Sequence, residues 1–562
     1  MPRSLLSQEP LGDLDMALVA GRWPDDLGGE VVISTSGQDG APVHAFFGDG
    51  YLARFSLRPG TFGAPADRFA WRARRIDTPS ARLKDARPDV FVNGPMGTHS
   101  PFGASNSANT APLPWGDRLF ATWDAGRPVE VDPVSLAFVG EVGHRDDWNP
   151  AFDHPVLPLL LSTAHPVIDP ERDCLWTVAI NPMTGAIDVI HYSGSGSHVQ
   201  RWPLLDATAP QSMHTVAQTR DWLILVDCAF RGDPDELLNG AERSVTNFTD
   251  EPAYLVRKDA LLATAPGLPV PATSFRVAPE VMHYYAAYDD SDGIRLLLEH
   301  TVDTDLAYAM RADDVDALGR PVDPALRAMF NHPMHAAVIT VLDIDPTTGA
   351  WLEHAVCGGD ERLWGTQLSA QDWSIEGQTA PTAHHMTFMG FRPEVISQRA
   401  IAAYADRIEA AGGLPGEETA GVLASFDRDS LELTAEHTYD LDDYPTSPCF
   451  VPRDPDRSPA TSRYAGADPG GHDGYLVVPV MNDAGFRVEL FDAAAVGDGP
   501  VAVLAPPGGQ TVPFLLHAAW MPRAVPAPDV ERLRFADDLD GRLDRLPDDL
   551  AAVARKVAAD LG

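Results

Sequence analysis

The sequence predicts an all-β protein with the architecture of a β-propeller. Short runs rich in Val, Ile, Leu, Phe and Tyr alternate with turns that contain Asp, Pro or Gly, and one hairpin unit recurs along the chain. Radial repetition of such hairpins leaves only short, protected sheet edges. A sandwich of 562 residues would need two domains, and no linker rich in Pro, Ser or Gly divides this chain.

The recurring unit is a strand, a turn with Asp-Pro or Asp-x-Asp, and a second strand. The aspartate bonds to its own backbone and the proline pre-sets φ, so these turns suit type I geometry. Copies of the unit lie at residues 127–142, 164–180, 337–356, 422–439 and 486–505. Each copy predicts a β-hairpin.

Two regions depart from this pattern. Residues 395–412 have helical spacing and run into Gly412 and Gly413, a helix stop signal. Residues 527–562 are acidic and carry apolar side chains at three- and four-residue steps. This spacing predicts a helix that packs on the propeller or mediates self-association. We therefore expect a propeller domain over residues 1–525 and a helical tail over residues 526–562.

Composition excludes several classes of function. The net charge of −39 argues against nucleic acid as a partner, because phosphate binding needs a basic face. The charge also disfavours docking to anionic lipid, although peripheral membrane contact for substrate uptake stays open, as does the oligomeric state. The N-terminus lacks the apolar run of a signal peptide and no apolar stretch could span a bilayer, so we expect a cytoplasmic location. The four cysteines form no CxxC pair, which argues against a cysteine zinc site or a disulfide framework.

Histidine carries the chemical signal, because the motifs HExxH, GxxxxGK[ST] and GxSxG are all absent. Four histidines lie at the start or middle of predicted strands: His165, His214, His283 and His517. They are too far apart to share one helix or loop. The innermost strand of every propeller blade faces the central axis, however, so four such strands can bring four side chains to one point. Four neutral imidazoles suit a borderline metal such as Fe(II) and leave positions free for dioxygen.

Other interpretations of the histidines remain open at this stage. A single histidine in an apolar strand is more often a structural residue than a ligand. His335 also opens a predicted strand and is the rival of His283 for the third position. His384 and His385 are interpreted as a surface or entrance pair, with a place near the metal as the alternative. Structural roles are expected for the histidines at four further positions: His300, His332, His354 and His472.

Several segments resemble the carotenoid cleavage oxygenase family. The opening GRWPDDLGG with HAFFGDGYLARFSL, and the hairpin ANTAPLPWGDRLFATWDAGRPVEVDP, are similar to that family's N-terminal motifs. The contexts STAHPVIDP, SMHTVAQTRDWLILVD, MHYYAAYDD and FLLHAAWMP are similar to its ligand segments, in the family's order. The resemblance covers roughly residues 18–523.

The resemblance implies both a fold and an activity. The fold is a seven-bladed propeller with a helical and loop dome over the metal face. The cofactor is one Fe(2+) ion held by the four histidines, with no organic cofactor. The activity is cleavage of a carbon–carbon double bond in an elongated apolar substrate, a carotenoid, apocarotenoid or other polyene, with O2 to give carbonyl products.

The second shell departs from the family pattern. Family members usually hold the outer nitrogens of three ligands with glutamates, which fix the tautomer and basicity of the imidazole. Asp124 stands where the first glutamate is expected, and Ser447 stands where another precedes the Pro-containing strand. The segment HHMTFMGFRP, which should supply the remaining acid, is followed only by Glu394. Loss of such partners lowers metal affinity roughly ten- to a hundredfold, so the site is either retuned or impaired.

Trp123 bears on the substrate. Stilbene-cleaving relatives typically carry a lysine immediately before the first glutamate, and Trp123 in its place favours a polyene over a phenolic stilbene. Cleavage of a phenylpropenoid or stilbene, isomerisation or monooxygenation, and a non-catalytic propeller that binds a lipid or a protein are the alternatives. Candidates for the lining of the substrate tunnel are residues 156–161 with Phe102, Trp123, Tyr284 and Phe514, and for each of them a place in the ordinary core is the more common alternative.

Overall fold

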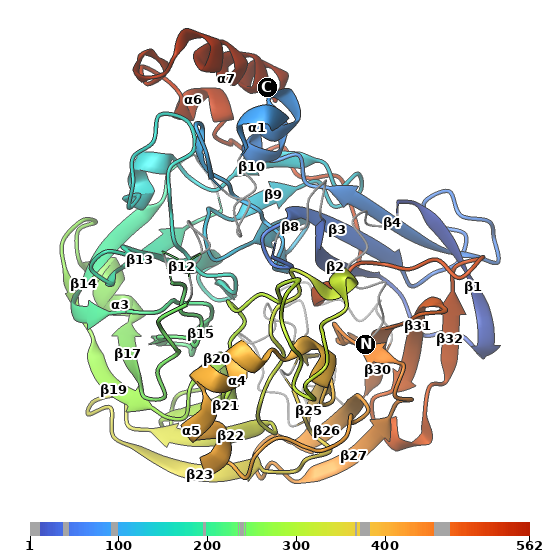
Figure 1. The fold of residues 1–562 in the computed structure, drawn as a ribbon. Coiled ribbons are helices and arrows are strands. Elements are labelled where there is room, and N and C mark those ends of the chain that lie inside the picture. The colour runs from blue at the N-terminus through green and yellow to red at the C-terminus, as the bar shows by residue number, and fades with distance from the viewer. Residues whose placement is uncertain are drawn as a thin grey trace.

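The computed structural model describes most of the chain. The described residues are 12–37, 44–91, 99–194, 198–233, 235, 241, 243–365, 368–370, 383–453 and 473–561. Over these residues the chain forms an all-β, propeller-like ring of twisted sheets with few helices (Figure 1). The predicted all-β fold class is confirmed.

Five sheets of four or five strands follow one another around the ring. The first contains β7 (Ala111–Trp115), β8 (Arg118–Thr122), β9 (Val129–Val131) and β10 (Phe138–Glu141). The second contains β11 (Val167–Asp169), β12 (Cys174–Ile180), β13 (Ala186–Tyr192), β14 (Gln200–Thr208) and β18 (Val270–Pro271). The third contains β15 (Val216–Gln218), β16 (Trp222–Val226), β17 (Glu251–Arg257) and β19 (Thr273–Val277). The fourth contains β20 (Val281–Ala286), β21 (Ile294–His300), β22 (Val338–Ile344) and β23 (Trp351–Gly358), and the fifth β24 (Leu368–Ser369), β25 (Ala383–Phe388), β26 (Val422–Asp427) and β27 (Leu433–Thr438).

A ten-stranded sheet joins the two ends of the chain. Its N-terminal strands are β1 (Leu14–Gly21), β2 (Glu30–Gly37), β3 (Asp49–Ser56) and β4 (Phe69–Arg75). Its C-terminal strands are β28 (Tyr444–Pro445), β29 (Cys449–Pro452), β30 (Gly474–Asn482), β31 (Gly485–Asp492), β32 (Ala502–Ala505) and β33 (Leu515–Met521). β33 pairs antiparallel with β2, and β1 pairs with both β32 and β4, so late and early strands share one hydrogen-bonded sheet. A separate two-stranded sheet contains β5 (His99–Ser100) and β6 (Gly103–Ala104).

The predicted hairpins are confirmed, and their turns work as expected. Each of the five ranges holds an antiparallel strand pair: β9–β10, β11–β12, β22–β23, β26–β27 and β31–β32. In the first, the Asp132 carboxylate accepts hydrogen bonds from the backbone N–H groups of Val134 and Ser135. In the fourth, Asp427 accepts the equivalent bonds from Asp429 and Ser430. The side chain thus supplies the turn's own acceptor.

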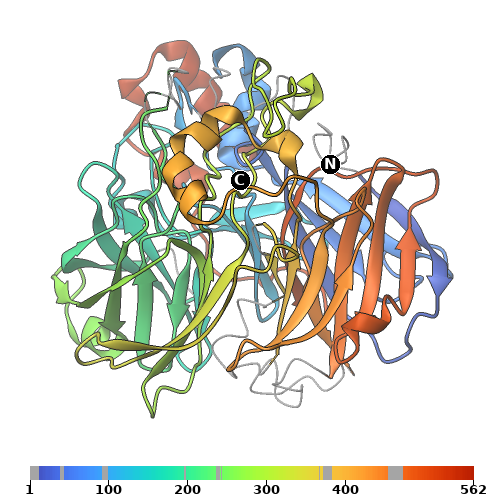
Figure 2. The same cartoon turned by 60° about the horizontal axis from the view of Figure 1, so that its bottom comes forward.

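The helix expected at 395–412 forms as two short helices. α4 (Gln398–Ala403) and α5 (Ala405–Ala410) are separated by Tyr404, whose φ and ψ of −114° and 14° interrupt the helical geometry. The Tyr404 hydroxyl donates to the buried Asp305 carboxylate at 2.5 Å, which fixes this break against the sheets. α4 and α5 lie at the same end of the ring as α1 (Pro79–Ala86) and the C-terminal helices (Figure 2).

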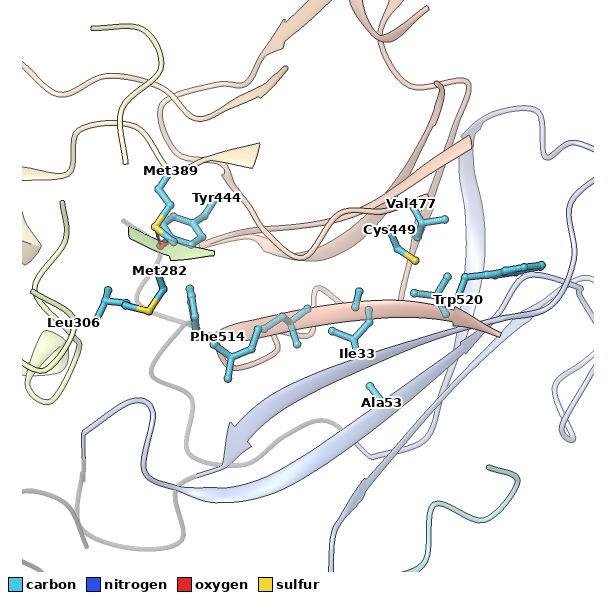
Figure 3. Packing of buried hydrophobic residues seen from close by; sticks show 14 of the residues in the cluster. Ile33, Ala53, Met282, Leu306, Met389, Tyr444, Cys449, Val477, Phe514 and Trp520 are labelled. Carbon is cyan, nitrogen blue, oxygen red and sulfur yellow. Dashed lines mark hydrogen bonds between the residues drawn. The ribbon is translucent and has the colours of Figure 1, made fainter. Parts of the chain in front are cut away.

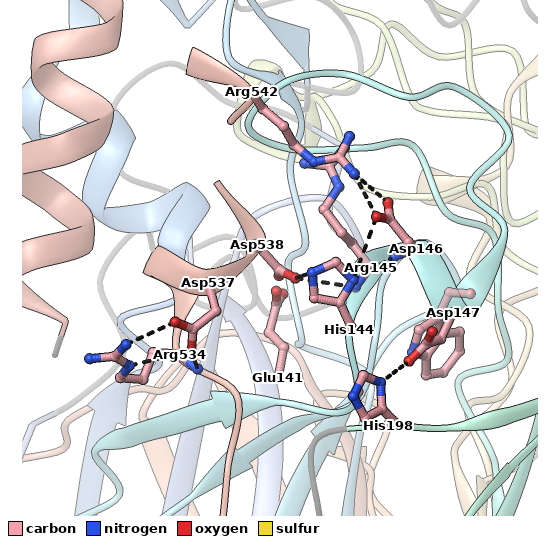
Figure 4. A network of polar contacts seen from close by, with 12 residues as sticks. Glu141, His144, Arg145, Asp146, Asp147, His198, Arg534, Asp537, Asp538 and Arg542 are labelled. Carbon is pink, nitrogen blue, oxygen red and sulfur yellow. Dashed lines mark hydrogen bonds and ion pairs between the residues drawn. The ribbon is translucent and has the colours of Figure 1, made fainter. Parts of the chain in front are cut away.

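The C-terminal segment forms α6 (Phe535–Asp538) and α7 (Asp548–Asp560), and α7 packs against α1. Apolar side chains of the C-terminal segment form one cluster with earlier residues of the chain, among them Leu83, Phe102 and Leu157. Asp538 anchors the segment, because its carboxylate accepts a hydrogen bond from Arg127 at 2.5 Å. It accepts another from the backbone N–H of Arg145 at 3.2 Å (Figure 4). The remaining helices are α3 (Lys258–Ala263) and single turns of 3₁₀ helix at 88–90, 145–148, 324–326, 393–395, 496–498 and 543–545. Within the described part of the chain, no helix has the length and apolarity needed to cross a bilayer.

Candidate metal centre

Each of the four predicted histidines belongs to an innermost strand or directly precedes one. His283 lies in β20 and His517 in β33, whereas His165 and His214 lie just before β11 and β15. β11, β15 and β20 are the first strands of their sheets. Three of the histidines thus lie where the chain enters a new sheet, His517 lies on the last strand of the ten-stranded sheet, and the ring brings these four points together.

Backbone hydrogen bonds tie neighbouring entry points to one another. His165 N donates to His214 O at 3.1 Å, and Val216 N donates back to His165 O at 3.1 Å. The Thr163 hydroxyl also donates to His214 O at 2.7 Å, and the Thr215 hydroxyl donates to Met282 O, next to His283, at 2.9 Å. The histidines are therefore held by backbone that is itself cross-linked between sheets, as a preorganised site requires.

The four imidazoles form one compact group. One nitrogen from each of His165, His214, His283 and His517 lies within 4.8 Å of those of the other three. Nitrogen ligands lie about 2 Å from a transition metal ion, so ligands of one ion are about 4 Å or less apart. Movements of a few tenths of an ångström would bring all four nitrogens to bonding distance of one ion, and the donor set fits the metal that the sequence predicted.

Burial lowers the pKa of three of the four histidines, His165, His283 and His517. It lowers the pKa of His165 well below its ordinary value, and repulsion from His517, His214 and His283 lowers that pKa further. Burial likewise lowers the pKa of His517 well below the usual range, and the neighbouring imidazoles add to the effect. Neutral imidazoles keep the lone pairs that a metal ion needs.

Asp124 contacts His214 as a second-shell carboxylate would. Its two oxygens lie 2.9 and 3.0 Å from His214 Nδ1. An ionised carboxylate only accepts hydrogen bonds, so Nδ1 carries the proton and Nε2 keeps its lone pair for the metal. The shorter aspartate side chain therefore still reaches the imidazole.

The sequence reasoning missed a second carboxylate, Glu299. Its Oε2 lies 3.5 Å from His283 Nδ1, and its Oε1 accepts a hydrogen bond from His384 Nε2 at 2.9 Å. Burial acts to raise the pKa of Glu299, but the hydrogen bonds from His283 and His384 outweigh burial and lower it. The sequence held a signal for this acid, because a hairpin turn centred on Ser291 pairs position 283 with position 299, as the register shows.

Ser447 makes a different contact from the one its position suggested. Its hydroxyl donates to the carbonyl oxygen of Leu516, the residue before His517. This hydrogen bond therefore joins Ser447 to the backbone next to His517 and not to the imidazole. A supporting role for Ser447 stays a prediction.

The other histidines lie outside the group. His335 Nδ1 faces the carbonyl of Ala336 at 2.5 Å, so the structure groups His283, not its rival, with the other three. His385 bonds Ser425 at 2.8 Å, and the pair His384–His385 is buried, which corrects its interpretation as a surface or entrance pair. His300 bonds Pro279 O and Thr340, both at 2.9 Å. His332 stacks on Phe330 and His354 faces Asp343, whereas His472 lies outside the described residues.

A cavity of about 860 Å³ reaches this group, and its lining is mostly apolar. His214, His283, His517 and Asp124 all line it. At one end Phe46, Phe330 and Phe514 form an aromatic cluster with ring centroids 4.6 to 6.2 Å apart. Met282, Leu306 and Met389 lie beside Phe514 there (Figure 3).

The lining of the cavity also reaches the surface. Phe152 is part of this lining and is 54% exposed, and Arg231 is the single cation among the described lining residues. The Arg231 guanidinium packs over the Phe248 ring and donates to the carbonyl of Thr246. The lining therefore combines an aromatic cluster with a single cation.

The structure corrects part of the predicted lining. Trp123 and Phe514 line the cavity, and the 156–161 segment contributes Leu157, Leu159 and Leu161. Phe102 instead packs with α7, and the Tyr284 hydroxyl is bonded within the sheets to the backbone of Thr215 and Val226. Both are buried core residues.

Comparisons with known proteins agree with this geometry. The family model described as retinal pigment epithelial membrane protein matches residues 6–522. The carotenoid cleavage dioxygenase 7 of Oryza sativa subsp. japonica is 36% identical over 110 residues, which cover 19% of this chain and 18% of the relative. The apocarotenoid-15,15'-oxygenase of Synechocystis sp. is 29% identical over 182 residues, covering 30% of this chain and 34% of the relative. These alignments span about a fifth to a third of the curated relatives' length.

Solved structures resemble the chain over nearly its full length. Lignostilbene dioxygenase of Pseudomonas brassicacearum has a TM-score of 0.62 at 15% identity, covering 92% of this chain and 97% of that one. Cobalt-substituted ACO of Synechocystis has a TM-score of 0.58 at 18% identity, covering 93% and 99%. At these identities the likeness concerns the fold.

Proposed function

The chain belongs to the retinal pigment epithelial membrane protein family, and from that membership we propose that it is an iron-dependent oxygenase that cleaves a carbon–carbon double bond. The observation that carries this proposal is the compact group of four imidazoles, three of which line a mostly apolar cavity. The proposed iron ligands are His165, His214, His283 and His517. The relatives named as a carotenoid cleavage dioxygenase and an apocarotenoid oxygenase support the reaction class.

The proposed reaction consumes one alkene and one O2 and gives two carbonyl compounds. Both oxygen atoms enter the products, so no external reductant is needed. An iron(II) ion held by the four imidazoles would supply the activation of dioxygen that this chemistry requires. The protein's own residues orient the ligands, through Asp124 and Glu299, and hold the substrate in a water-poor cavity.

We propose an elongated polyene with one polar end, such as an apocarotenoid, as the substrate. The aromatic cluster in the lining suits the apolar part of such a chain, and Arg231 in the same lining suits an oxygen-bearing end group. Trp123 lines the cavity and no lysine lies among its described lining residues, which favours a polyene over a phenolic stilbene.

The finer architecture belongs to the same proposal. We propose that the ten-stranded sheet represents two blades joined through β1, one formed by β33 with β2, β3 and β4 and the other by β28 to β32. Together with the five separate sheets this count gives seven blades. We further propose that α4, α5 and the loops around them act as a dome over the metal face, and that residues 526–562 form a tail outside the propeller.

The test is reconstitution with Fe(II) without oxygen, followed by incubation with an apocarotenal, an apocarotenoic acid and a hydroxylated stilbene under ¹⁸O₂. We expect stoichiometric iron and two aldehyde products that each carry the label, provided they are reduced with borohydride at once, since aldehyde oxygen exchanges with water. His283→Ala should lose iron, whereas the matched variant His335→Ala should keep it.

Each other outcome identifies one alternative. Label in only one product indicates a monooxygenase, and an unlabelled isomer indicates an isomerase. Preferred cleavage of the stilbene overturns the polyene assignment. Failure of the wild-type protein to take up iron overturns the oxygenase proposal in favour of a non-catalytic propeller.

A further inference from the structure

Glu299 lies between a ligand of the proposed metal site and a histidine of the neighbouring sheet. It is on β21, directly opposite His283 of β20 in the antiparallel register, so both side chains lie on the same face of that sheet. His384 comes from β25, the second strand of the next sheet, and reaches the same point. The three residues are 1% to 4% exposed. The carboxylate therefore has almost no access to solvent.

The carboxylate uses one oxygen for each histidine. Oε1 accepts from His384 Nε2 at 2.9 Å, and Oε2 faces His283 Nδ1 at 3.5 Å. A buried carboxylate is costly unless hydrogen-bonded, and it can only accept, so both facing nitrogens must carry protons. For His283 this leaves Nε2 as the lone pair that points away from Glu299. Hydrogen bonds around catalytic groups are commonly long before the bound state forms and shorten within it.

His384 lies at the start of HHMTFMGFRP, the segment where the family resemblance led us to expect an acid. In this chain the acid comes from β21 and the residue at that segment is the donor that holds it. The acid was expected on the sheet that contains β25, but it lies on the sheet that contains β21, and β25 supplies the hydrogen-bond donor instead.

We propose that Glu299 and His384 are a coupled pair of positioning residues for His283, in which His384 holds the Glu299 carboxylate in place and Glu299 fixes the tautomer and orientation of the ligand. The inference rests on the proposed metal site. In this arrangement His384 acts on the metal site through Glu299 and His283. The arrangement also explains how His283, the third proposed ligand, has a carboxylate beside it although the expected acid is absent.

The test measures Co²⁺ binding by the metal-free full-length protein, using calorimetry together with the visible d–d absorption of the bound ion. Glu299→Gln and His384→Leu should each weaken Co²⁺ binding about ten- to a hundredfold and alter the d–d bands. The double variant should be no weaker than Glu299→Gln alone, because the two residues act as one unit. His384→Gln keeps an N–H donor and should restore most of the affinity and the wild-type spectrum.

Two controls separate positioning from general damage. His385→Leu changes the adjacent buried histidine, which bonds Ser425 instead, and should leave affinity and spectrum unchanged. Asp124→Asn weakens the support of a different ligand, so its effect should add to that of His384→Leu rather than overlap with it. The thermal midpoint of each metal-free variant reports whether it is folded. If His384→Leu does not fold, His384→Asn, whose amide is too short to reach Glu299, takes its place.

The outcomes are distinct. If wild-type protein binds Co²⁺ and His384→Leu or His384→Asn binds it equally tightly with the same spectrum, the pair is structural and this inference is wrong. Additive losses in the double variant would also overturn it. If wild-type protein binds neither Co²⁺ nor Fe²⁺, the proposed function itself fails.

Discussion

Buried neutral histidines outside the metal group shape the stability of this protein at acidic pH. His300 donates from Nδ1 to Pro279 O and accepts at Nε2 from the Thr340 hydroxyl, both at 2.9 Å. Burial lowers the pKa of His300 to about 4, although the bond to Pro279 acts in the opposite direction. Between pH 6.5 and 4 the unfolded chain therefore binds a proton at this position and the folded chain does not. The free energy of unfolding must fall as the pH is lowered through that window.

Replacing His300 by Gln isolates this effect. The variant should be less stable than wild type near pH 7, because a well-bonded side chain is lost, but the difference should shrink by about 1.4 kcal/mol per pH unit as the pH falls from 6.5 towards 4. Urea unfolding at a series of pH values measures it. The comparison of wild type with the variant is needed because other groups also change the stability in this pH range. Burial raises the pKa of Asp227 to about 7, and this shift makes the free energy of unfolding rise as the pH falls. Parallel stability curves across the window would contradict the prediction.

Individual residues also show what the sequence could and could not reveal about the site. The four histidines were predictable because the segment around each resembles a ligand segment of the family, which strand placement alone could not have decided. Glu299 was predictable in principle from the hairpin turn centred on Ser291. His384 was not, because its contact with Glu299 joins two sheets whose relative placement no local pattern encodes. Phe102 was misplaced for the same reason, since the apolar cluster to which it belongs includes side chains of a helix more than 400 residues later in the chain.

At the scale of elements, the hairpins were predictable because an Asp-containing turn and two apolar strands are local features. The single helix predicted at 395–412 was wrong in one respect, because Tyr404 is drawn out of helical geometry by its bond to Asp305. A tertiary partner overrode local propensity there. The C-terminal segment is a different case, because its helical character was predicted correctly from the sequence. The surface against which it packs, which includes α1, could not be predicted and is known only from the structure.

Asp538 is the main polar anchor of the C-terminal helices. It is 3% exposed and, together with Glu141, it neutralises the buried Arg127. Asp538→Asn keeps the shape but removes the charge, and should cost on the order of 2 kcal/mol. We expect faster hydrogen exchange in residues 534–561 and in α1, and also around Leu157, which packs with α7 and lines the cavity.

Asp540→Asn is the matched control for that experiment, because it removes the same charge from an exposed neighbouring position. Its exchange pattern should equal that of the wild-type protein. Equal exchange in the two variants would mean that Asp538 does not anchor the segment.

At the scale of the whole molecule, the junction of β2 with β33 joins the early and late parts of the chain and also carries His517. Trp520 lies at this junction, opposite Val31 in the register, beside Ile33 in the core (Figure 3). It is 3% exposed, and its indole N–H donates to Gly28 O at 3.0 Å. Because a ring of sheets has no free edge only while this junction holds, damage here should affect the entire fold.

Trp520→Ala should therefore lower the free energy of unfolding by about 3–5 kcal/mol and weaken metal binding through the displaced His517. Trp351→Ala is the matched control, since that indole also donates to a backbone carbonyl at 3.0 Å but is 43% exposed on the outer strand β23. We expect it to cost about 1 kcal/mol or less and to leave metal binding intact. Denaturant unfolding with and without Co²⁺ compares the two. A closed ring predicts that stability and metal affinity decline together in Trp520→Ala but not in Trp351→Ala. Equal losses of both quantities in the two variants would therefore show that the junction is no more critical than the outer edge of a blade.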